Sequence, residues 1–475
     1  MVFSATVFLY LFLPIVLIVH TLAPRRFRNP WLLAASLFFY GWGEPRLLGA
    51  MVVSIAINGL AGVHLGRHRG RRVGRIALAL AITANLALLA WFKYRGFFGA
   101  NLDHLLGLFG REPMGWAAVA LPVGISFYTF QAMSYLVDVW RGDTEPQRDV
   151  ISFAMYIALF PQLVAGPIVR YREIAREIAE RRLSRSRFAT GVRRFIIGLG
   201  KKMLIANVAA VTADAVFDLD PAELTTAVAW VGVLAYTIQI YFDFSGYSDM
   251  AIGLGLMLGF TFPENFRHPY VATSVTDFWR RWHITLSSWF RDYLYIPLGG
   301  NRGGGWRTRR NLLVVFLLCG LWHGPAWTFV IWGLWHGAFL VFERSAAGRR
   351  LQSGSPILGR IYLLSVVVAG WVFFRADDLS QALAMFAAMF GGGAGDPGSH
   401  PLSLVVGRDA WFVLPLAILG STPWMAQLRA RLAGVSRRTS NLVHGLATAA
   451  LALVFFASAV ELAAQTHNPF IYFRF

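Results

Sequence analysis

The stretch Gly-Leu-Trp-His-Gly at residues 320–324 lies between two strongly apolar runs, Leu312–Leu318 and Trp327–Val341. Pro325 follows it directly, and proline cannot continue a helix already in progress, because it lacks a backbone N–H and its ring collides with the preceding turn. The pattern therefore predicts two apolar helices with a break between them. His323 is the ionisable side chain at that break, and it is our first candidate for a functional residue.

The composition of the chain indicates a polytopic membrane protein. Of its 475 residues, 56% are hydrophobic and only 15% are charged, and the mean hydropathy is +0.52. The apolar runs have helical length and lack the strict alternation of a membrane β-barrel. We expect one all-α integral membrane domain over residues 1–475, with a catalytic core at about 121–342 and roughly ten to twelve membrane-embedded helices, some of them re-entrant or interfacial.

The net charge of +19 comes from basic residues that cluster in short loops beside apolar runs. This pattern is typical of cytoplasmic loops held against anionic lipid, so we expect membrane lipid and no nucleic acid as a partner. Val2–Leu22 is predicted to be a retained first membrane helix. Arg25–Arg28 and Arg67–Arg72 then place two loops in the cytoplasm and the N-terminus outside. We expect the lone Cys319 to be a small core residue, and no cluster has the spacing of a zinc site.

Two segments in the first half of the chain depart from simple membrane helices. Leu121–Trp140 is apolar in length but carries serine, threonine, glutamine and tyrosine side chains, so it is expected to face the interior of a helix bundle. Phe153–Val169 contains two prolines and a glycine, which predicts a bent or re-entrant segment. Arg170–Arg194 is rich in arginine and glutamate and is expected to form helices at the cytoplasmic surface.

Two carboxylates, Asp243 and Asp249, stand at the mouth of an apolar segment. Asp243 and Tyr247 are one helical turn apart and share a face. An unpaired carboxylate in such a place is costly, so each is expected to have a partner such as a tyrosine hydroxyl or an arginine. Structural anchoring and a direct role in binding substrate both remain open for this pair.

Thr276–Tyr293 is the clearest amphipathic stretch, with Thr276 as its expected N-cap. As one helix, it would place His283 in the middle of a face rich in tryptophan and phenylalanine, opposite a face with arginines. The alternatives are a buried, hydrogen-bonded structural histidine and a catalytic one. The glycine-rich loop at 297–305 follows, with Arg302 inside it and Arg307, Arg309 and Arg310 after it. These arginines suit phosphate groups but do not form a P-loop, and solvated surface charges are the alternative.

Several motifs together resemble the membrane-bound O-acyltransferases, and within them the bacterial alginate O-acetylase branch. The matching stretches, in chain order, are LPVGISFYTFQ at 121–131, FPQLVAGPI at 160–168, YFDFSGYSD at 241–249, FWRRWHITLSSW at 278–289, YIPLGGNR at 295–302, GLWHG at 320–324 and YFRF at 472–475. They cover nearly the whole chain. The resemblance implies a ring of membrane helices around a thinned core, in which a cytoplasmic and an external opening meet near the catalytic histidine.

By this resemblance His323 corresponds to the family's catalytic histidine and His283 to its second histidine or asparagine. His336 is a competing candidate that lacks a helix break beside it. A neutral histidine suits the general base that takes a hydroxyl proton. His283 would then donate to the oxyanion or orient the thioester. The substrate-binding candidates are Asp243, Tyr247, Trp282, Trp322 and Arg302.

The implied activity is transfer of an acetyl group from a cytoplasmic donor across the bacterial inner membrane, for O-acetylation of an exopolysaccharide such as alginate. No bound cofactor is expected. The donor is acetyl-coenzyme A or another acyl thioester, with an acyl carrier protein as a possible partner. An external acetyltransferase partner protein and a polysaccharide acceptor complete the expected set. The alternatives are O-acetylation of peptidoglycan or cellulose, a transporter with a proton relay, and a scaffold for polysaccharide export.

Overall fold

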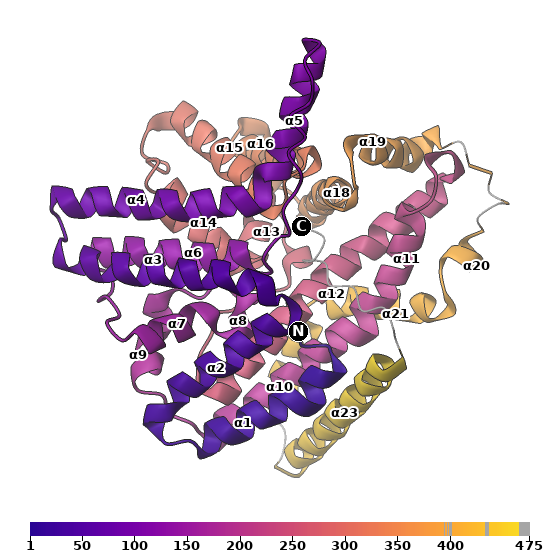
Figure 1. The fold of residues 1–475 in the computed structure, drawn as a ribbon. Coiled ribbons are helices and arrows are strands. Elements are labelled where there is room, and N and C mark those ends of the chain that lie inside the picture. The colour runs from indigo at the N-terminus through magenta and orange to yellow at the C-terminus, as the bar shows by residue number, and fades with distance from the viewer. Residues whose placement is uncertain (394, 397, 399–400, 433–436, 465–475) are drawn as a thin grey trace. The chain divides into compact units, whose positions relative to one another are not determined.

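The computed structural model describes residues 1–393, 395–396, 398, 401–432 and 437–464. The secondary structure of these residues is helical throughout, without a β-strand (Figure 1). Contacts divide the chain into two compact units. Unit 1 comprises 1–192 and 251–263, and unit 2 comprises 193–250 and 264–475, so the division falls within helices α10 (Arg185–Gly200) and α12 (Thr226–Leu258).

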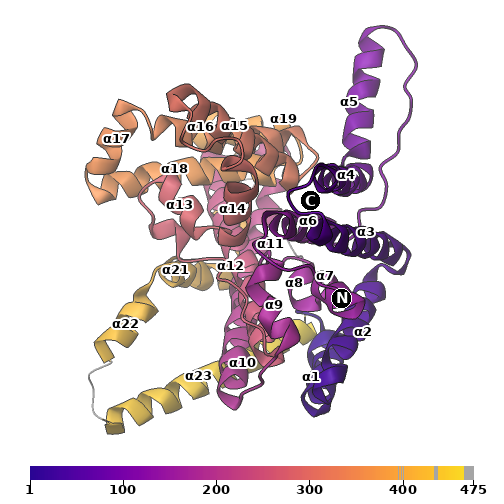
Figure 2. The same cartoon turned by 90° about the vertical axis from the view of Figure 1, so that its left-hand side faces the viewer.

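Unit 1 contains the first part of α10, the end of α12 and a series of further helices, in which η denotes a short 3₁₀- or π-helix. Its remaining elements are η1 (Phe8–Phe12), α1 (Leu13–Leu22), α2 (Arg25–Gly43), η2 (Pro45–Leu47), α3 (Leu48–Arg67), α4 (Arg72–Leu89), η3 (Ala90–Tyr94), α5 (Arg95–Leu108), α6 (Ile125–Arg141), α7 (Val150–Ala158), α8 (Phe160–Leu163) and α9 (Tyr171–Ala179). Helix α6 packs against α3 and α4, as Figures 1 and 2 both show.

The polar helix and the bent segment of unit 1 have the predicted character. Almost every residue of α6 is buried, so its serine, threonine and glutamine side chains face protein. The helix starts only at Ile125, because Gly124 adopts a φ of 75° and a Cβ there would lie 2.4 Å from the Leu163 carbonyl oxygen. The predicted bend falls at Leu159, between α7 and α8, and every residue of α8 is buried.

Unit 2 holds the second half of the chain. After the remainder of α10 its elements are η4 (Lys201–Ala206), α11 (Asn207–Phe217), η5 (Pro221–Glu223), α12, η6 (Pro269–Val271), α13 (Val275–Arg281), α14 (Ile284–Phe290), η7 (Arg291–Tyr295), α15 (Gly304–His323), α16 (Trp327–Phe342), α17 (Ala346–Ser353), α18 (Pro356–Arg375), α19 (Leu379–Ala387), η8 (Ala388–Gly392), α20 (Leu402–Val405), α21 (Arg408–Gly420), α22 (Trp424–Leu432) and α23 (Arg437–Ala464).

Helices α15 and α16 form a tightly packed hairpin (Figures 1 and 2). Glycines make the close approach possible: a Cβ on Gly320 would lie 2.2 Å from the Phe329 carbonyl oxygen, and one on Gly333 would lie 2.2 Å from the Phe316 carbonyl oxygen. Small residues at facing positions are typical of membrane helix pairs. The predicted break is confirmed, because α15 ends at His323 and Gly324 is extended.

The prediction of a single amphipathic helix over Thr276–Tyr293 is wrong. The stretch forms two helices, α13 and α14, which are separated by Trp282 and His283. Ser274 caps α13 in place of the expected Thr276, with its side chain accepting a hydrogen bond from the Asp277 N–H. The buried carboxylate of Glu343 accepts further bonds from the N–H groups of Val275 at 2.5 Å and Thr276 at 3.0 Å.

By length and composition, six helical stretches of the described residues can cross a membrane. They are Pro45–Arg67, Arg72–Leu108, Arg185–Phe217, Thr226–Leu258, Pro356–Arg375 and Leu442–Ala464, and three shorter apolar stretches are Phe8–Leu22, Trp327–Phe342 and Leu379–Gly392. Together these stretches of the described residues approach the predicted total of roughly ten to twelve embedded helices, some of them re-entrant or interfacial. The aromatic motif at 472–475 lies outside the described residues.

Candidate functional site

The site in unit 2 is built around His283, which lies between α13 and α14 and is wholly buried. Its backbone adopts a φ of 42° and a ψ of 53°, in the left-handed region that non-glycine residues seldom occupy. The loop at Asn265 holds it there, because the Ile284 N–H donates to the Asn265 carbonyl oxygen at 2.9 Å and the Arg267 N–H donates to the Arg281 carbonyl oxygen at 2.9 Å.

The side chain of Asn265 fixes the tautomer of His283. Its Oδ1 accepts from the Thr285 N–H at 3.3 Å and from the Thr285 hydroxyl at 2.9 Å. A backbone N–H can only donate, so this atom of Asn265 is the oxygen, and its Nδ2 donates to the Ser248 hydroxyl at 3.0 Å. The Nδ1 of His283, 3.1 Å from the same oxygen, must therefore carry the proton.

The other ring nitrogen of His283, Nε2, consequently presents a lone pair. It is buried and makes no hydrogen bond to any residue that the structure describes. Burial lowers the pKa of His283 to about 3, so the ring is neutral near pH 7. The His283 ring is almost perpendicular to that of Phe244 in α12, with the two centroids 4.6 Å apart. Neutral His283 thus offers an acceptor in an apolar surrounding.

His323 lies beside His283 at the end of α15. The two ring centroids are 6.4 Å apart, and His323 is 5% exposed. Aromatic rings enclose it: Trp322 lies at 4.9 Å, Trp332 at 5.0 Å and Phe374 at 5.2 Å between centroids. Helices α15, α16 and α18 each supply part of this enclosure. The structure therefore brings together the two histidines that the sequence singled out.

His336 occupies a different place, within α16. Its ring stacks on Phe278 and meets the edges of Trp279 and Trp332, with centroids 5.1 to 6.4 Å away. Trp332 contacts both His323 and His336, so the indole stands between them. As predicted, no helix break lies beside His336. This geometry gives His336 a place in the aromatic core.

The carboxylates of α12 have the partners that their burial demands. Asp243 Oδ1 lies 2.7 Å from Nζ of Lys202 in η4, and both side chains are almost wholly buried. Asp249 pairs with Arg194 at 2.9 Å and with Lys201 at 2.7 Å. An arginine was expected as a partner and serves Asp249, whereas Asp243 is paired with a lysine. Tyr247 is buried one turn after Asp243.

The two tryptophans predicted to bind substrate both lie near the histidines. The ring of Trp322 is 6.0 Å from His283 between centroids. Trp282 is the immediate neighbour of His283 and packs on Trp371 of α18, with centroids 5.0 Å apart. Arg302, by contrast, is exposed in the loop before α15.

Sequence reasoning missed Asn265, Lys202 and the α18 aromatic residues. Asn265 stands in Pro-Glu-Asn-Phe at 263–266, directly after a long apolar helix. Lys202 belongs to a Lys-Lys pair that interrupts the apolar run Phe195–Val216. A buried lysine needs an anionic partner, so this interruption was a usable signal for Asp243. Phe374 and Trp371 stand in an apolar run, Ile361–Phe374, without a motif or spacing that points to the site.

No group of three or more metal-ligating side chains occurs in the part of the chain that the structure describes. The sequence model of MBOAT, the membrane-bound O-acyltransferase family, matches residues 147–378, a range that contains both histidines and the carboxylates of α12. The match therefore covers the residues of the site and the helices that position them.

Curated relatives extend the similarity over the whole chain. The chain is 43% identical to the probable alginate O-acetylase AlgI of Azotobacter vinelandii and 42% identical to that of Pseudomonas putida. In each case the similarity covers all of both chains. It is also 37% identical to the peptidoglycan O-acetyltransferase of Helicobacter pylori, over 82% of this chain and 80% of that one. This multi-pass membrane protein therefore belongs to the membrane-bound O-acyltransferase family.

Proposed function

We propose that this enzyme is a bacterial inner-membrane O-acetyltransferase that serves O-acetylation of an exopolysaccharide such as alginate. The observation that carries the assignment is the pair of buried histidines, His283 and His323, inside an aromatic enclosure of an O-acyltransferase. The full-length similarity to two probable alginate O-acetylases favours exopolysaccharide as the acceptor. Acetyl-coenzyme A or another acyl thioester on the cytoplasmic side would be the donor.

The reaction breaks the C–S bond of an acetyl thioester and forms a C–O bond to a hydroxyl group. A base takes the hydroxyl proton, and the departing thiolate receives a proton in turn, so the exchange needs no oxidant or reductant. We assign the base to His323. The centroid separation of 6.4 Å lets both imidazoles touch one acyl group and its attacking hydroxyl. The family's external acetyltransferase partner would pass the acetyl group on to the glycan.

The tautomer of His283 limits the roles that its Nε2 atom can have in the reaction. An oxyanion and a thioester both require a hydrogen-bond donor, but Nε2 of neutral His283 is an acceptor. We therefore assign Nε2 of His283 to a second hydroxyl group of the acceptor, which can donate to it and orient the acceptor, while the attacking hydroxyl gives its single proton to His323. The indole N–H of Trp322 is our side-chain candidate for the oxyanion, since its ring contacts both histidines.

The test compares O-acetyl ester in secreted polysaccharide and, separately, in peptidoglycan, in cells that carry each variant at matched membrane levels. We expect His323→Ala to abolish the ester of the exopolysaccharide, because the base is lost. His104→Ala changes an exposed histidine of α5 and is the matched control. Full retention of ester in His323→Ala contradicts the assignment, and loss confined to peptidoglycan moves the acceptor to the class that the Helicobacter pylori relative is named for.

The second candidate function, O-acetylation of peptidoglycan, is favoured by the similarity to that relative. The variant His336→Gln tests whether acetyl transfer depends only on the rings that enclose His323 or also on the aromatic core around them. His336 belongs to that core, because it lies on the far side of Trp332 from His323. We expect the variant to retain acetylation at matched membrane levels. Complete loss in His336→Gln at normal membrane levels, together with retained acetylation in His323→Ala, would assign the base to His336.

A further inference from the structure

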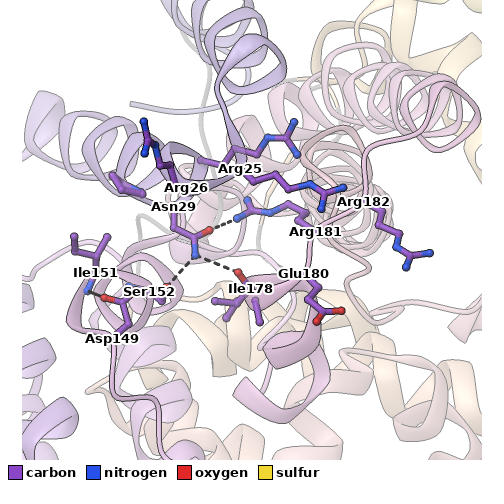
Figure 3. Close-up of a pocket in the computed structure, with 13 residues that line it drawn as sticks. Arg25, Arg26, Asn29, Asp149, Ile151, Ser152, Ile178, Glu180, Arg181 and Arg182 are labelled. Atoms are coloured by element: carbon purple, nitrogen blue, oxygen red, sulfur yellow. Dashed lines mark hydrogen bonds between the residues drawn. The ribbon is translucent and has the colours of Figure 1, made fainter.

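A pocket of about 830 Å³ lies within unit 1, remote in sequence from the histidines. Helix α2 and the segments around α7 and α9 form its walls (Figure 3). Five arginines line it, whereas only two carboxylates do; the arginines are Arg25, Arg26, Arg28, Arg181 and Arg182. Such an excess of guanidinium groups around one cavity favours an anion that can accept several hydrogen bonds at once.

Arg181 is the central side chain of this arginine pocket and is only 6% exposed. Its Nη2 donates to the Oδ1 of Asn29, and its guanidinium carbon lies 4.3 Å from the centre of the Phe260 ring. Its Nε and Nη1 are buried and make no hydrogen bond to any described residue. A buried cation with two nitrogens that lack hydrogen-bond acceptors is costly unless an anion pairs with it.

The carboxylates of the pocket do not supply that anion. Asp149 caps α7, where its Oδ2 accepts from the Ser152 N–H at 3.1 Å and from the Ser152 hydroxyl at 2.6 Å. Glu180 is exposed and has its carboxylate turned away from Asn29 (Figure 3). Burial and the neighbouring Arg28 lower the pKa of Arg181 to about 10, which still leaves it charged near pH 7.

Asn29 holds Arg181 in position. Its Nδ2 donates to the Ser152 hydroxyl at 2.9 Å and to the Ile178 carbonyl oxygen at 3.1 Å, so its Oδ1 points at the guanidinium (Figure 3). Helices α2, α7 and α9 are thus joined at this point. The cation is pre-organised before any ligand arrives, which reduces the cost of binding one.

The surroundings of the pocket are those of a membrane surface. Arg25 begins α2 directly after α1, whose Ile18 and Leu22 are exposed apolar side chains. Phe27, between two of the arginines, is 52% exposed. The positive-inside pattern predicts that the first turn of α2, Arg25–Arg28, lies on the cytoplasmic side. A ligand here can place a phosphate among the arginines while its hydrocarbon chains cover the apolar side chains of α1 and α2.

We propose that the arginine pocket binds the head group of an anionic phospholipid of the cytoplasmic leaflet, with its phosphate on Arg181. The site is independent of the acetyl-transfer chemistry assigned to unit 2. Its ligand differs from an acyl thioester, because it is held from the membrane side and is not consumed.

The proposal is tested by native mass spectrometry of the full-length protein in detergent, with phosphatidylglycerol and phosphatidylethanolamine of matched acyl chains as probes. We expect the wild-type protein to bind phosphatidylglycerol about tenfold more tightly, and Arg181→Gln to lose about fivefold or more of that preference. Arg72→Gln removes the same charge from an exposed position at the start of α4 and is expected to keep it. Equal binding of the two lipids by the wild-type protein overturns the proposal.

A second variant guards against misfolding of Arg181→Gln, which also loses its bond to Asn29. The double variant Arg25→Gln/Arg182→Gln changes two exposed arginines and leaves that bond intact. It is expected to weaken phosphatidylglycerol binding with unchanged thermal unfolding, and unchanged binding counts against the proposal. Displacement of the lipid by an equal concentration of coenzyme A or inorganic phosphate would assign the pocket to a soluble phosphate compound and overturn the lipid assignment.

Discussion

At the residue scale, the chemistry of His283 is decided by Asn265. The amide oxygen of Asn265 receives three donors, and one of them is a backbone N–H, so the direction of every bond in the cluster is fixed. The imidazole cannot exchange its tautomer without breaking its bond to Asn265. Asn265 is therefore a positioning residue that acts through His283.

Asn265→Ala is expected to lower acetylation at least about tenfold, because Nδ1 of His283 loses the acceptor that fixes its proton. It should also destabilise the protein by about 1–3 kcal/mol, because the buried Thr285 N–H loses its partner. Asn265→Asp keeps an acceptor for both groups and should recover part of the activity. Ester content at matched membrane levels measures the effect. A fully active Asn265→Ala would show that the tautomer does not matter.

Asp243 has two candidate roles, structural anchoring and substrate binding. The two roles lead to opposite expectations for acetylation in the same double variant. Asp243→Asn leaves Lys202 buried without its counter-ion and should destabilise the protein by about 3–5 kcal/mol. The double variant Asp243→Leu/Lys202→Met removes both charges. If the pair is an anchor, the double variant recovers membrane level and acetylation together. Recovery of the membrane level without acetylation would instead assign Asp243 to the substrate.

At the scale of elements, the position of the site depends on how α13 begins. Glu343, directly after α16, accepts three hydrogen bonds from the first two residues of α13, including one from the Thr276 hydroxyl at 2.6 Å. A carboxylate at a helix N-terminus also interacts favourably with the helix dipole. One side chain thus ties the helix that leads to His283 to the hairpin that carries His323.

Glu343→Ala is expected to lower the free energy of unfolding by about 1–3 kcal/mol, because buried N–H groups of α13 lose their acceptor. Glu343→Gln keeps one acceptor oxygen and should cost less. Thermal unfolding of the protein in detergent measures both. Glu145→Gln is the control, since that carboxylate is 83% exposed and a surface ion pair contributes little. Equal unfolding temperatures for Glu343→Ala and the control would refute this role.

Elements also divide into those that the sequence predicts and those that it does not. The break after His323 follows from the local Gly-Pro sequence, and the bend between α7 and α8 from Pro161. The break at His283 has no such local cause, because residues 281–284 contain neither glycine nor proline. It arises from hydrogen bonds to a distant loop, and those depend on the complete fold. The pairing of Lys202 with Asp243 is a tertiary contact of the same kind.

At the scale of the whole molecule, the distribution of arginines predicts topology. The turn between α2 and α3 is expected outside and the loop between α3 and α4 inside. The only cysteine of the chain, Cys319, is buried, so introduced cysteines can be labelled against a low background. This property makes the prediction directly measurable.

In spheroplasts, a membrane-impermeant maleimide is expected to label Arg46→Cys but to label Arg71→Cys only after lysis. Both positions are exposed arginines of unit 1, so the two variants are matched. The unmodified protein is the control for reaction of Cys319. The opposite labelling pattern would invert the topology and would also move the arginine pocket to the external leaflet.

The left-handed backbone at His283 has a consequence for any survey of sequence variants. The backbone there favours glycine, asparagine, aspartate and histidine and opposes valine, isoleucine and threonine, whatever the side chain does in the reaction. In a saturation library at residue 283, each substitution would consequently have two separate effects. One is on the amount of protein in the membrane, and the other is on acetyl transfer. Asparagine is the informative survivor, because it suits this backbone and keeps a polar side chain but has no imidazole.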